Sequence, residues 1–356
     1  MAADCASNAF GSLQPEAIDN EQAEDRDMMN VLLTVDTEVC PLRTRWREEQ
    51  LRQDVRRDIY AETEQGVFGL DYEIGVLNAF GLKAVFFVEP LVAEAVGLDP
   101  VKEIVRRIDQ GGHEVQLHAH PEWLAWASRP LLQSRGPRKL GELSAEEQGQ
   151  VVRLALKNLR DAGGRDIIAF RAGDFAADSH TLAALAKCGI LWDSSYNCCF
   201  SHSLADVKDL TRCGKPTRVN GVWELPIAWW LAPPGGVRPA QITASSYAEM
   251  AGALMSAWSE GWKTFVIIFH TFEFLKKRRQ RVERPSPDWL AVRRFRNLCR
   301  FLSNHRDKFR TCGFEDLAKD VARLNGSDGE PAPKPIASPV HRTAGRWLEQ
   351  GLRLLT

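Results

Sequence analysis

The sequence predicts an α/β protein built on a distorted (β/α)7-type barrel of parallel strands, with flexible N- and C-terminal tails. Short, strongly apolar segments alternate along the chain with amphipathic ones, which is the pattern of consecutive βαβ units. About six or seven apolar segments occur at spacings typical of such units, and this favours a barrel or near-barrel. Several of them end in chemically active polar side chains, as strands of barrel enzymes do.

In the first half of the chain the expected elements alternate regularly. The strand 31–38 (VLLTVDTE) is apolar until its two carboxylates, and 83–90 (KAVFFVEP) is closed by a proline. Helices are expected between the strands, because apolar residues recur there on one face and Gly111 and Gly112 supply a stop. In order, these strands and helices are 31–38, 69–80 (helix), 83–90, 100–110 (helix) and 114–123.

The second half continues the alternation. The helix expected over 144–164 is the clearest, since Ser144 and Glu147 have the spacing of a capping box and two glycines close it. The segment 263–274 (KTFVIIFHTFEF) is the most apolar strand of all. In order, these elements are 144–164 (helix), 166–175, 179–189 (helix), 190–197, 222–230, 247–261 (helix) and 263–274.

Composition suggests one barrel domain with appendages. We expect a disordered acidic arm over 1–28, the barrel over 29–324, a Pro-rich linker over 325–340 and a short amphipathic helix over 341–356. The 356 residues carry a formal net charge of -1, which argues against a nucleic-acid binder.

The chain shows no secretory leader and no apolar run long enough to span a membrane, so we expect a cytoplasmic protein. The cysteines show no CxxC spacing and are expected to be reduced. The sequence does not predict the oligomeric state.

Polar residues at the strand ends suggest a metal site. Side chains at i and i+2 of a strand share a face, so Asp36 and Glu38 form one pair and His118 and His120 another. Two imidazoles and one carboxylate, with a position left open for water, commonly bind catalytic zinc. We therefore predict a divalent cation, most often Zn²⁺, with Co²⁺, Ni²⁺, Mn²⁺ or Fe²⁺ as alternatives. Each residue taken singly is more often a turn, cap or polar surface residue.

Six segments in one order give the chain a family resemblance. LLTVDTE, LKAVFFVEP, GGHEVQLHAHPEW, AFRAGDF, LWDSSYN and FVIIFHTFEF, spread over about 30–274, resemble the motifs of polysaccharide deacetylases, the carbohydrate esterases with a NodB-like homology domain. The resemblance implies a carbohydrate substrate. It implies that Asp36 is the catalytic base, that Arg171 orients it, that His270 is the general acid, and that His118 is the first metal-binding histidine.

The chain departs from this family pattern at two positions. Thr37 occupies the place of a second, metal-binding aspartate, and Glu38 is the expected replacement ligand. The usual H-x-x-x-H spacing would put Glu122 at the second histidine, whereas His120 shares a face with His118. We therefore prefer His120 as the ligand and keep Glu122 as its rival.

Four further assignments are less direct. Asp193 is either the partner that keeps His270 protonated or a strand-end turn residue. A backbone N–H near Asp174 or Phe175 is expected to stabilise the oxyanion. Trp123 and Trp229 line a sugar-binding groove or fill the core, with equal weight.

The expected function is hydrolytic removal of N-acetyl, or O-acetyl, groups from an amino sugar or polysaccharide intermediate. One alternative is a metal hydrolase of another non-peptide C–N bond on the same barrel, because fold alone does not fix the substrate. The other is a non-catalytic carbohydrate-binding relative, which the threonine at position 37 motivates.

Overall fold

A computed structural model of the chain describes residues 28–39, 48–127, 131–132, 138–207, 216–276, 285–321, 336–339, 341–343, 345, 346 and 349. The acidic arm expected over 1–28 lies outside the described residues apart from Met28. Most of the expected linker over 325–340 also lies outside them.

A curled, mainly parallel sheet forms the centre of the molecule, in the order β12-β1-β4-β5-β6-β7-β9-β8 with β13 beside β1. The strands of this sheet are β1 (Met29–Thr37), β4 (Val85–Val88), β5 (Glu114–Ala119), β6 (Ala169–Ala172), β7 (Trp192–Asp193), β8 (Thr217–Val219), β9 (Val222–Glu224), β12 (Thr264–His270) and β13 (Phe309–Thr311). Neighbours from β12 to β9 pair in parallel, and only β8 runs antiparallel to its neighbour. The prediction of a distorted parallel (β/α) barrel is confirmed.

Irregular segments connect the two ends of the curled sheet. Ala228 N–H donates to the Val266 carbonyl (3.0 Å), and Ile268 N–H donates to the Ala240 carbonyl (2.9 Å). Ala240 N–H in turn donates to the Ala228 carbonyl (2.7 Å). The gap between β9 and β12 is thus bridged without a regular strand.

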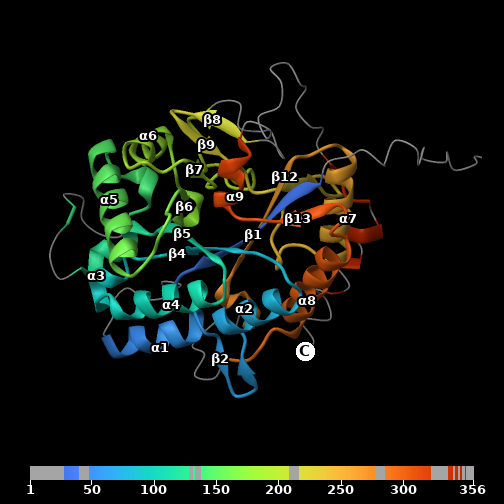
Figure 1. Cartoon of the computed structure of the whole chain (residues 1–356), viewed down its shortest axis with the longest axis horizontal. Coiled ribbons are helices and arrows are strands. Elements are labelled where there is room, and N and C mark those ends of the chain that lie inside the picture. Colours follow the sequence, from blue (N-terminus) through green and yellow to red (C-terminus); the bar gives the residue numbers. More distant parts are fainter. Residues whose placement is uncertain are drawn as a thin grey trace, which may run out of the picture.

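Helices surround the sheet, as Figure 1 shows. They are α1 (Glu48–Asp58), α2 (Leu70–Ala79), α3 (Ala93–Val96), α4 (Asp99–Gln110), α5 (Ala145–Asp161), α6 (Ser179–Lys187), α7 (Tyr247–Ser259), α8 (Trp289–Asn304) and α9 (Phe314–Lys319). Ser144 caps α5 in the expected capping box with Glu147. Among the described helices, none is both long and apolar enough to cross a membrane.

Several strand ends turn sooner than the sequence suggested. The apolar runs continue into short 3-10 helices: η2 (Pro121–Trp126), η4 (Gly173–Phe175) and η5 (Thr271–Phe274). A further 3-10 turn, η3 (Leu140–Glu142), precedes α5. The run 222–230 splits, and β10 (Trp229–Leu231) leaves the main sheet to pair with β11 (Val237–Pro239). A hairpin of β2 (Glu62–Thr63) and β3 (Gly66–Val67) also lies outside the main sheet.

Two apolar clusters fill the molecule. The larger lies between sheet and helices, and the smaller fills the inside of the curled sheet with residues such as Leu32, Trp192 and Ile268. Phe314 and Leu317 of α9 belong to the inner cluster, and the Phe314 ring centroid lies 5.7 Å from that of Phe87. Because α9 follows β13, which pairs with the start of β1, it closes the amino-terminal end of the barrel. The carboxyl-terminal end of the barrel, where Asp36 and His270 lie, is the opposite end.

Part of the C-terminal region packs against the barrel. Leu231 N–H donates to the Ile336 carbonyl (2.9 Å), and Ser338 N–H donates to the Leu231 carbonyl (2.8 Å). Further on, Glu349 accepts from Arg294 of α8 at 2.8 Å.

Glu114 generates a prediction on stability. It is 5% exposed at the start of β5, accepts the Phe314 N–H at 3.0 Å, and burial raises its pKa from 4.5 to about 7. Because folding favours the protonated form, this contribution to stability is present below pH 4.5 and is lost as the pH rises through 7. Compared with Glu114→Gln, the natural protein should therefore lose about 3 kcal/mol between pH 5 and 8 in urea unfolding.

The matched control is Glu260→Gln, at an exposed carboxylate that ends α7. It should track the natural protein at every pH. An equal pH dependence of Glu114→Gln and the natural protein would show that Glu114 is already ionised without penalty.

Candidate functional site

The site lies where the central strands end at the carboxyl edge of the barrel. Asp36 of β1 is in register with His270 of β12 on one side and with Phe87 of β4 on the other. Asp36 is 2% exposed, and Glu38 is 8% exposed just past the strand end. Strand alternation thus directs both carboxylates of the first motif to the same mouth.

His118 of β5 and His120, which directly follows that strand, converge on Glu38. His118 Nε2 lies 3.0 Å from Glu38 Oε2, and His120 Nε2 also contacts that oxygen. Nitrogen and oxygen atoms of Glu38, His118 and His120 lie within 4.8 Å of one another, and all three residues are buried. The structure therefore brings together the three residues that the sequence suggested as metal ligands.

The hydrogen bonding of His118 suits a cation. Its Nδ1 lies 2.8 Å from the Arg171 carbonyl, which can only accept, so Nδ1 carries a proton. In the neutral ring, Nε2 then turns a lone pair towards Glu38. Two lone-pair groups at 3.0 Å repel each other unless a proton or a metal ion lies between them.

His120 shows the same need for positive charge. Its Nε2 contacts the carboxylate of Glu38, and its Nδ1 contacts that of Glu122. Among the described residues, neither ring nitrogen has a partner with hydrogen-bond geometry. Burial alone would lower the pKa of His120, but Glu38 and Glu122 raise it well above the usual range. Burial would likewise raise the pKa of Glu38, yet His120 and His118 hold it well below the usual range. This donor set, two imidazoles and a carboxylate, fits a divalent cation.

The rival ligand Glu122 lies on the other side of His120. Its Oε2 is 3.4 Å from His120 Nδ1, whereas His120 Nε2 faces Glu38. The geometry therefore groups His120, rather than Glu122, with Glu38 and His118. Glu122 is placed to orient the His120 ring.

Arg171 of β6 holds Asp36. Its Nη1 donates to Asp36 Oδ1 at 2.6 Å, while Nε and Nη2 donate to the carbonyl and hydroxyl of Ser194 at 3.0 and 3.1 Å. The guanidinium carbon lies 4.3 Å from the centre of the Phe87 ring, and Arg171 is fully buried. One carboxylate oxygen of Asp36 is thus fixed, and the other remains towards the site.

His270 stands beside both carboxylates. Its Nε2 lies 3.8 Å from Asp36 Oδ2 and 3.8 Å from Glu38 Oε1. Its Nδ1 lies 3.0 Å from Glu273 Oε1. Burial opposes the charged ring, but Glu273 and the two other carboxylates raise the pKa of His270 to about 9.

Glu273, rather than Asp193, is the partner of His270. Asp193 accepts from Ser195 Oγ at 2.6 Å and faces Glu224, and burial raises the pKa of both carboxyl groups. The sequence pattern did not indicate Glu273, because it predicts 263–274 as one strand, in which residues i and i+3 face opposite sides. The 3-10 turn η5 instead brings these two positions together.

The remaining predicted residues do not belong to the ligand group. Asp174 and Phe175 occupy η4 with φ of 51° and 58°, and the Asp174 carboxylate pairs with Lys139 at 3.0 Å. Trp123 is 1% exposed and packs in the outer core, so it offers no surface to a sugar. Trp229 is half-buried in β10.

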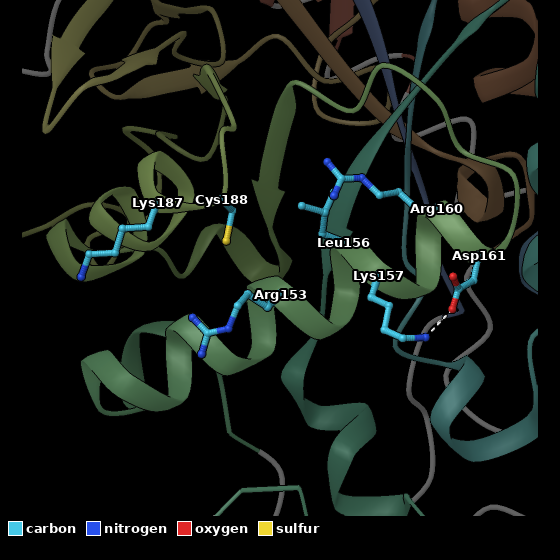
Figure 2. A pocket seen from close by; sticks show the side chains of 7 residues that line it. All are labelled: Arg153, Leu156, Lys157, Arg160, Asp161, Lys187 and Cys188. Atoms are coloured by element: carbon cyan, nitrogen blue, oxygen red, sulfur yellow. Dashed lines mark hydrogen bonds and ion pairs between the residues drawn. The ribbon is translucent and has the colours of Figure 1, made fainter.

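A groove of about 330 Å³ lies elsewhere, between α5 and α6 (Figure 2). It is lined by Arg153, Leu156, Lys157, Arg160, Asp161, Lys187 and Cys188. Arg160 and Lys187 sit in the last turns of their helices, where basic residues complement the helix dipole. In βα units these helix ends lie at the barrel end opposite the strand carboxyl ends, so the groove is separate from the site.

Known structures identify the architecture. No family profile matches the sequence, and no curated protein matches it either. A candidate polysaccharide deacetylase from Mycobacterium smegmatis, known from its crystal structure, matches with a TM-score of 0.54 and 17% identity over 89% of this chain and 96% of that one. The two chains share one fold.

This deacetylase fold is the one that the sequence resemblance implied, and at 17% identity the match establishes the fold alone. Weaker similarities extend to a family 4 carbohydrate esterase from Streptomyces lividans (TM-score 0.39, 11% identity, 81% of this chain and 93% of that one). They also extend to a 4-alpha-glucanotransferase from Thermococcus litoralis (TM-score 0.47, 13% identity, 82% of this chain and 40% of that one).

Gly173 gives a test of the ligand geometry. A Cβ at this position would lie 2.5 Å from atoms of the His120 ring. Gly173→Ala should therefore push the imidazole away from Glu38 and weaken metal binding about ten- to a hundredfold. Metal content after dialysis and competition with a chelator would measure this.

The control is Gly75→Ala in α2, where a Cβ meets nothing within 4 Å. This variant should keep its metal and fold at least as stably, since alanine favours helix. Unchanged metal affinity in Gly173→Ala would remove His120 from the ligand set.

Proposed function

We propose that this protein is a metal-dependent hydrolase that removes acetyl groups, N-linked or O-linked, from an amino sugar or a polysaccharide intermediate. One observation supports this above the others. The Glu38–His118–His120 group, the Asp36–Arg171 pair and His270 meet at a single mouth of a deacetylase fold. Their chemistry supplies a cation site, a base and an acid for acyl transfer to water.

Glu38, His118 and His120 are the residues that would hold the cation, with Zn²⁺ preferred and Co²⁺, Ni²⁺, Mn²⁺ or Fe²⁺ as alternatives. When bound, such an ion supplies Lewis acidity and lowers the pKa of water towards neutrality. The three ligands come from the ends of β1 and β5, which are separated only by β4 in the sheet. A rigid scaffold of this kind fixes ligand positions better than a loop does.

Asp36 is the proposed base. Its Oδ1 is held by Arg171, so its other oxygen can accept a proton from the attacking water. The ion pair also prevents the carboxylate from rotating, because Arg171 is itself fixed by two bonds to Ser194. Backbone N–H groups near Asp174 or Phe175 are proposed to stabilise the tetrahedral oxyanion.

His270 is the proposed general acid. Glu273 accepts a hydrogen bond from the Nδ1–H of His270, and the Nε2–H of the same ring is directed towards Asp36 and Glu38. Thr243 Oγ1 donates to the second oxygen of Glu273 at 3.0 Å, and Gln241 also donates to this carboxylate. A protonated imidazole held in this way can deliver its Nε2 proton to the departing amine or alcohol.

Two other functions make different predictions. A hydrolase of small linear amides would cleave these and release no acetate from N-acetylglucosamine oligomers. A non-catalytic carbohydrate-binding protein would purify without stoichiometric metal and would bind sugars without turnover.

Asp36 and His118 separate catalysis from metal binding. Asp36→Asn should keep its metal and lose about 10²- to 10⁴-fold in kcat, because only the proton acceptor is removed. His118→Ala should lose both metal and activity. Elemental analysis and acetate release would measure the two properties, with circular dichroism to verify folding.

The control is His180→Ala, at an exposed histidine on α6, which should match the natural protein in both assays. Full metal content together with full activity in His118→Ala would refute the site.

Glu273 tests the role of His270. Glu273→Gln should lower kcat about ten- to a hundredfold with little change in KM, since the general acid contributes only in the transition state. Metal content should be unchanged, because Glu273 is not one of the three proposed metal ligands. The matched control is Asp109→Asn, at an exposed carboxylate of α4. An unaltered kcat in Glu273→Gln would leave His270 without a functional partner.

A further inference from the structure

A carboxylate from the C-terminal segment, which comprises the described residues from 336 to 349, pairs with a buried arginine of α8. Glu349 Oε2 accepts from Nε and Nη2 of Arg294 at 3.1 and 2.8 Å. Arg294 is 4% exposed, and within the described part of the chain no other carboxylate pairs with it. A buried guanidinium needs such a partner, because an unpaired charge out of water is strongly unfavourable.

Arg294 also holds a turn at residues 241–244. Its remaining nitrogen, Nη1, donates to the carbonyls of Ile242 and Thr243 at 3.3 and 3.4 Å. The guanidinium is planar, so Nη1 reaches both carbonyls only in one orientation of the group. The two hydrogen bonds to Glu349 fix that orientation from the other edge of the guanidinium.

The 241–244 turn supplies two donors to Glu273. Thr243 Oγ1 donates to Glu273 Oε2 at 3.0 Å, and Gln241 Nε2 donates to Glu273 Oε1. Glu273 is 3% exposed, and its Oε1 also lies 3.0 Å from His270 Nδ1. The orientation of this carboxylate, and with it that of the imidazole, therefore depends on where the turn places its two donors.

The C-terminal segment is docked on α7 as well, so the position of Glu349 is defined. Arg346 Nε lies 3.7 Å from Glu249 Oε2, and the Glu249 side chain is fully buried. The Arg342 guanidinium lies against Gly252, at a position where a Cβ would collide with it. These contacts deliver Glu349 to α8 from a segment that is itself held in place.

We propose that the C-terminal segment holds the general acid in its working orientation. Glu349 is a positioning residue for His270, and Arg294 with the 241–244 turn transmits its effect to the Glu273 carboxylate. We call Glu349, Arg294 and this turn the C-terminal brace. The inference rests on the proposed function, because that function gives His270 the role of the acid.

Kinetics of the metal-loaded, full-length protein test the C-terminal brace. Glu349→Ala should lower kcat for acetate release about three- to tenfold and leave KM and metal content unchanged, because the acid contributes only in the transition state. Glu349→Gln, which keeps an acceptor oxygen in place, should show a smaller loss of kcat. An unchanged kcat in Glu349→Ala overturns the inference.

A double-mutant cycle distinguishes positioning from a general loss of stability. In the Glu273→Gln background, Glu349→Ala should change kcat by less than about twofold, because the carboxylate on which the brace acts is already removed. A loss of kcat that is equally large in both backgrounds shows that Glu349 does not act through Glu273 and overturns the inference.

The matched control is Asp320→Ala. Asp320 pairs with Arg310 at 3.1 Å, and its side chain is 38% exposed, against 37% for Glu349. It ends α9, at the amino-terminal end of the barrel. This variant loses a similar ion pair far from His270 and should keep the kcat of the natural protein.

Hydrogen exchange separates the C-terminal brace from the proposed hydrolase. The Ala244 and Ser245 amides donate to the Gln241 carbonyl at 3.1 and 3.2 Å, so their exchange rates report on the turn. These amides should exchange about three- to tenfold faster in Glu349→Ala and at the natural rate in Asp320→Ala.

The two readouts together give distinct outcomes. Acetate release by the natural protein, with kcat and amide exchange unaltered in Glu349→Ala, retains the hydrolase and rejects the brace. Faster exchange in Glu349→Ala, without acetate release from any acetylated sugar by the natural protein, rejects the hydrolase and retains the brace as a structural link to His270.

Discussion

Charges buried at the barrel mouth are stable only in pairs, and this constraint organises the site. Moving an unpaired carboxylate or guanidinium out of water costs several kcal/mol, which a close, hydrogen-bonded partner offsets. Arg171 therefore donates hydrogen bonds to both Asp36 and Ser194. The Glu273 carboxylate accepts hydrogen bonds from His270, Gln241 and Thr243. The partners come from different strands and turns, so the positions of these elements depend on one another.

The sequence allowed much of the site to be predicted, because side-chain alternation is a local property of strands. Asp36 and Glu38, at and just past the end of β1, share a face whatever the rest of the fold does, and so do His118 and His120 at the end of β5. The roles of Glu273 and Asp193 were not predictable in this way, because they depend on where the strands end and on which face of each strand turns inward. Asp193 follows Trp192, whose ring fills the inner cluster, and so it points to the other side.

The fold was predictable where strands are apolar and helices are capped. The capping box of Ser144 and Glu147 predicted the start of α5, and the apolar run at 264–270 predicted β12. The pattern did not distinguish a strand from the 3-10 turn after it, because η2, η4 and η5 are apolar as well. Nor did it show α9 as the plug of the barrel, since that role depends on long-range packing of Phe314.

The position of β1 has a consequence for biosynthesis. This first strand is flanked by β12 and β13, from the last third of the chain, and Thr34 Oγ1 donates to a carbonyl 233 residues away, that of Ile267. During translation β1 therefore remains apolar and unpaired on one edge until β12, far along the chain, has been synthesised. Such a high contact order slows folding and makes the nascent chain a natural client of chaperones.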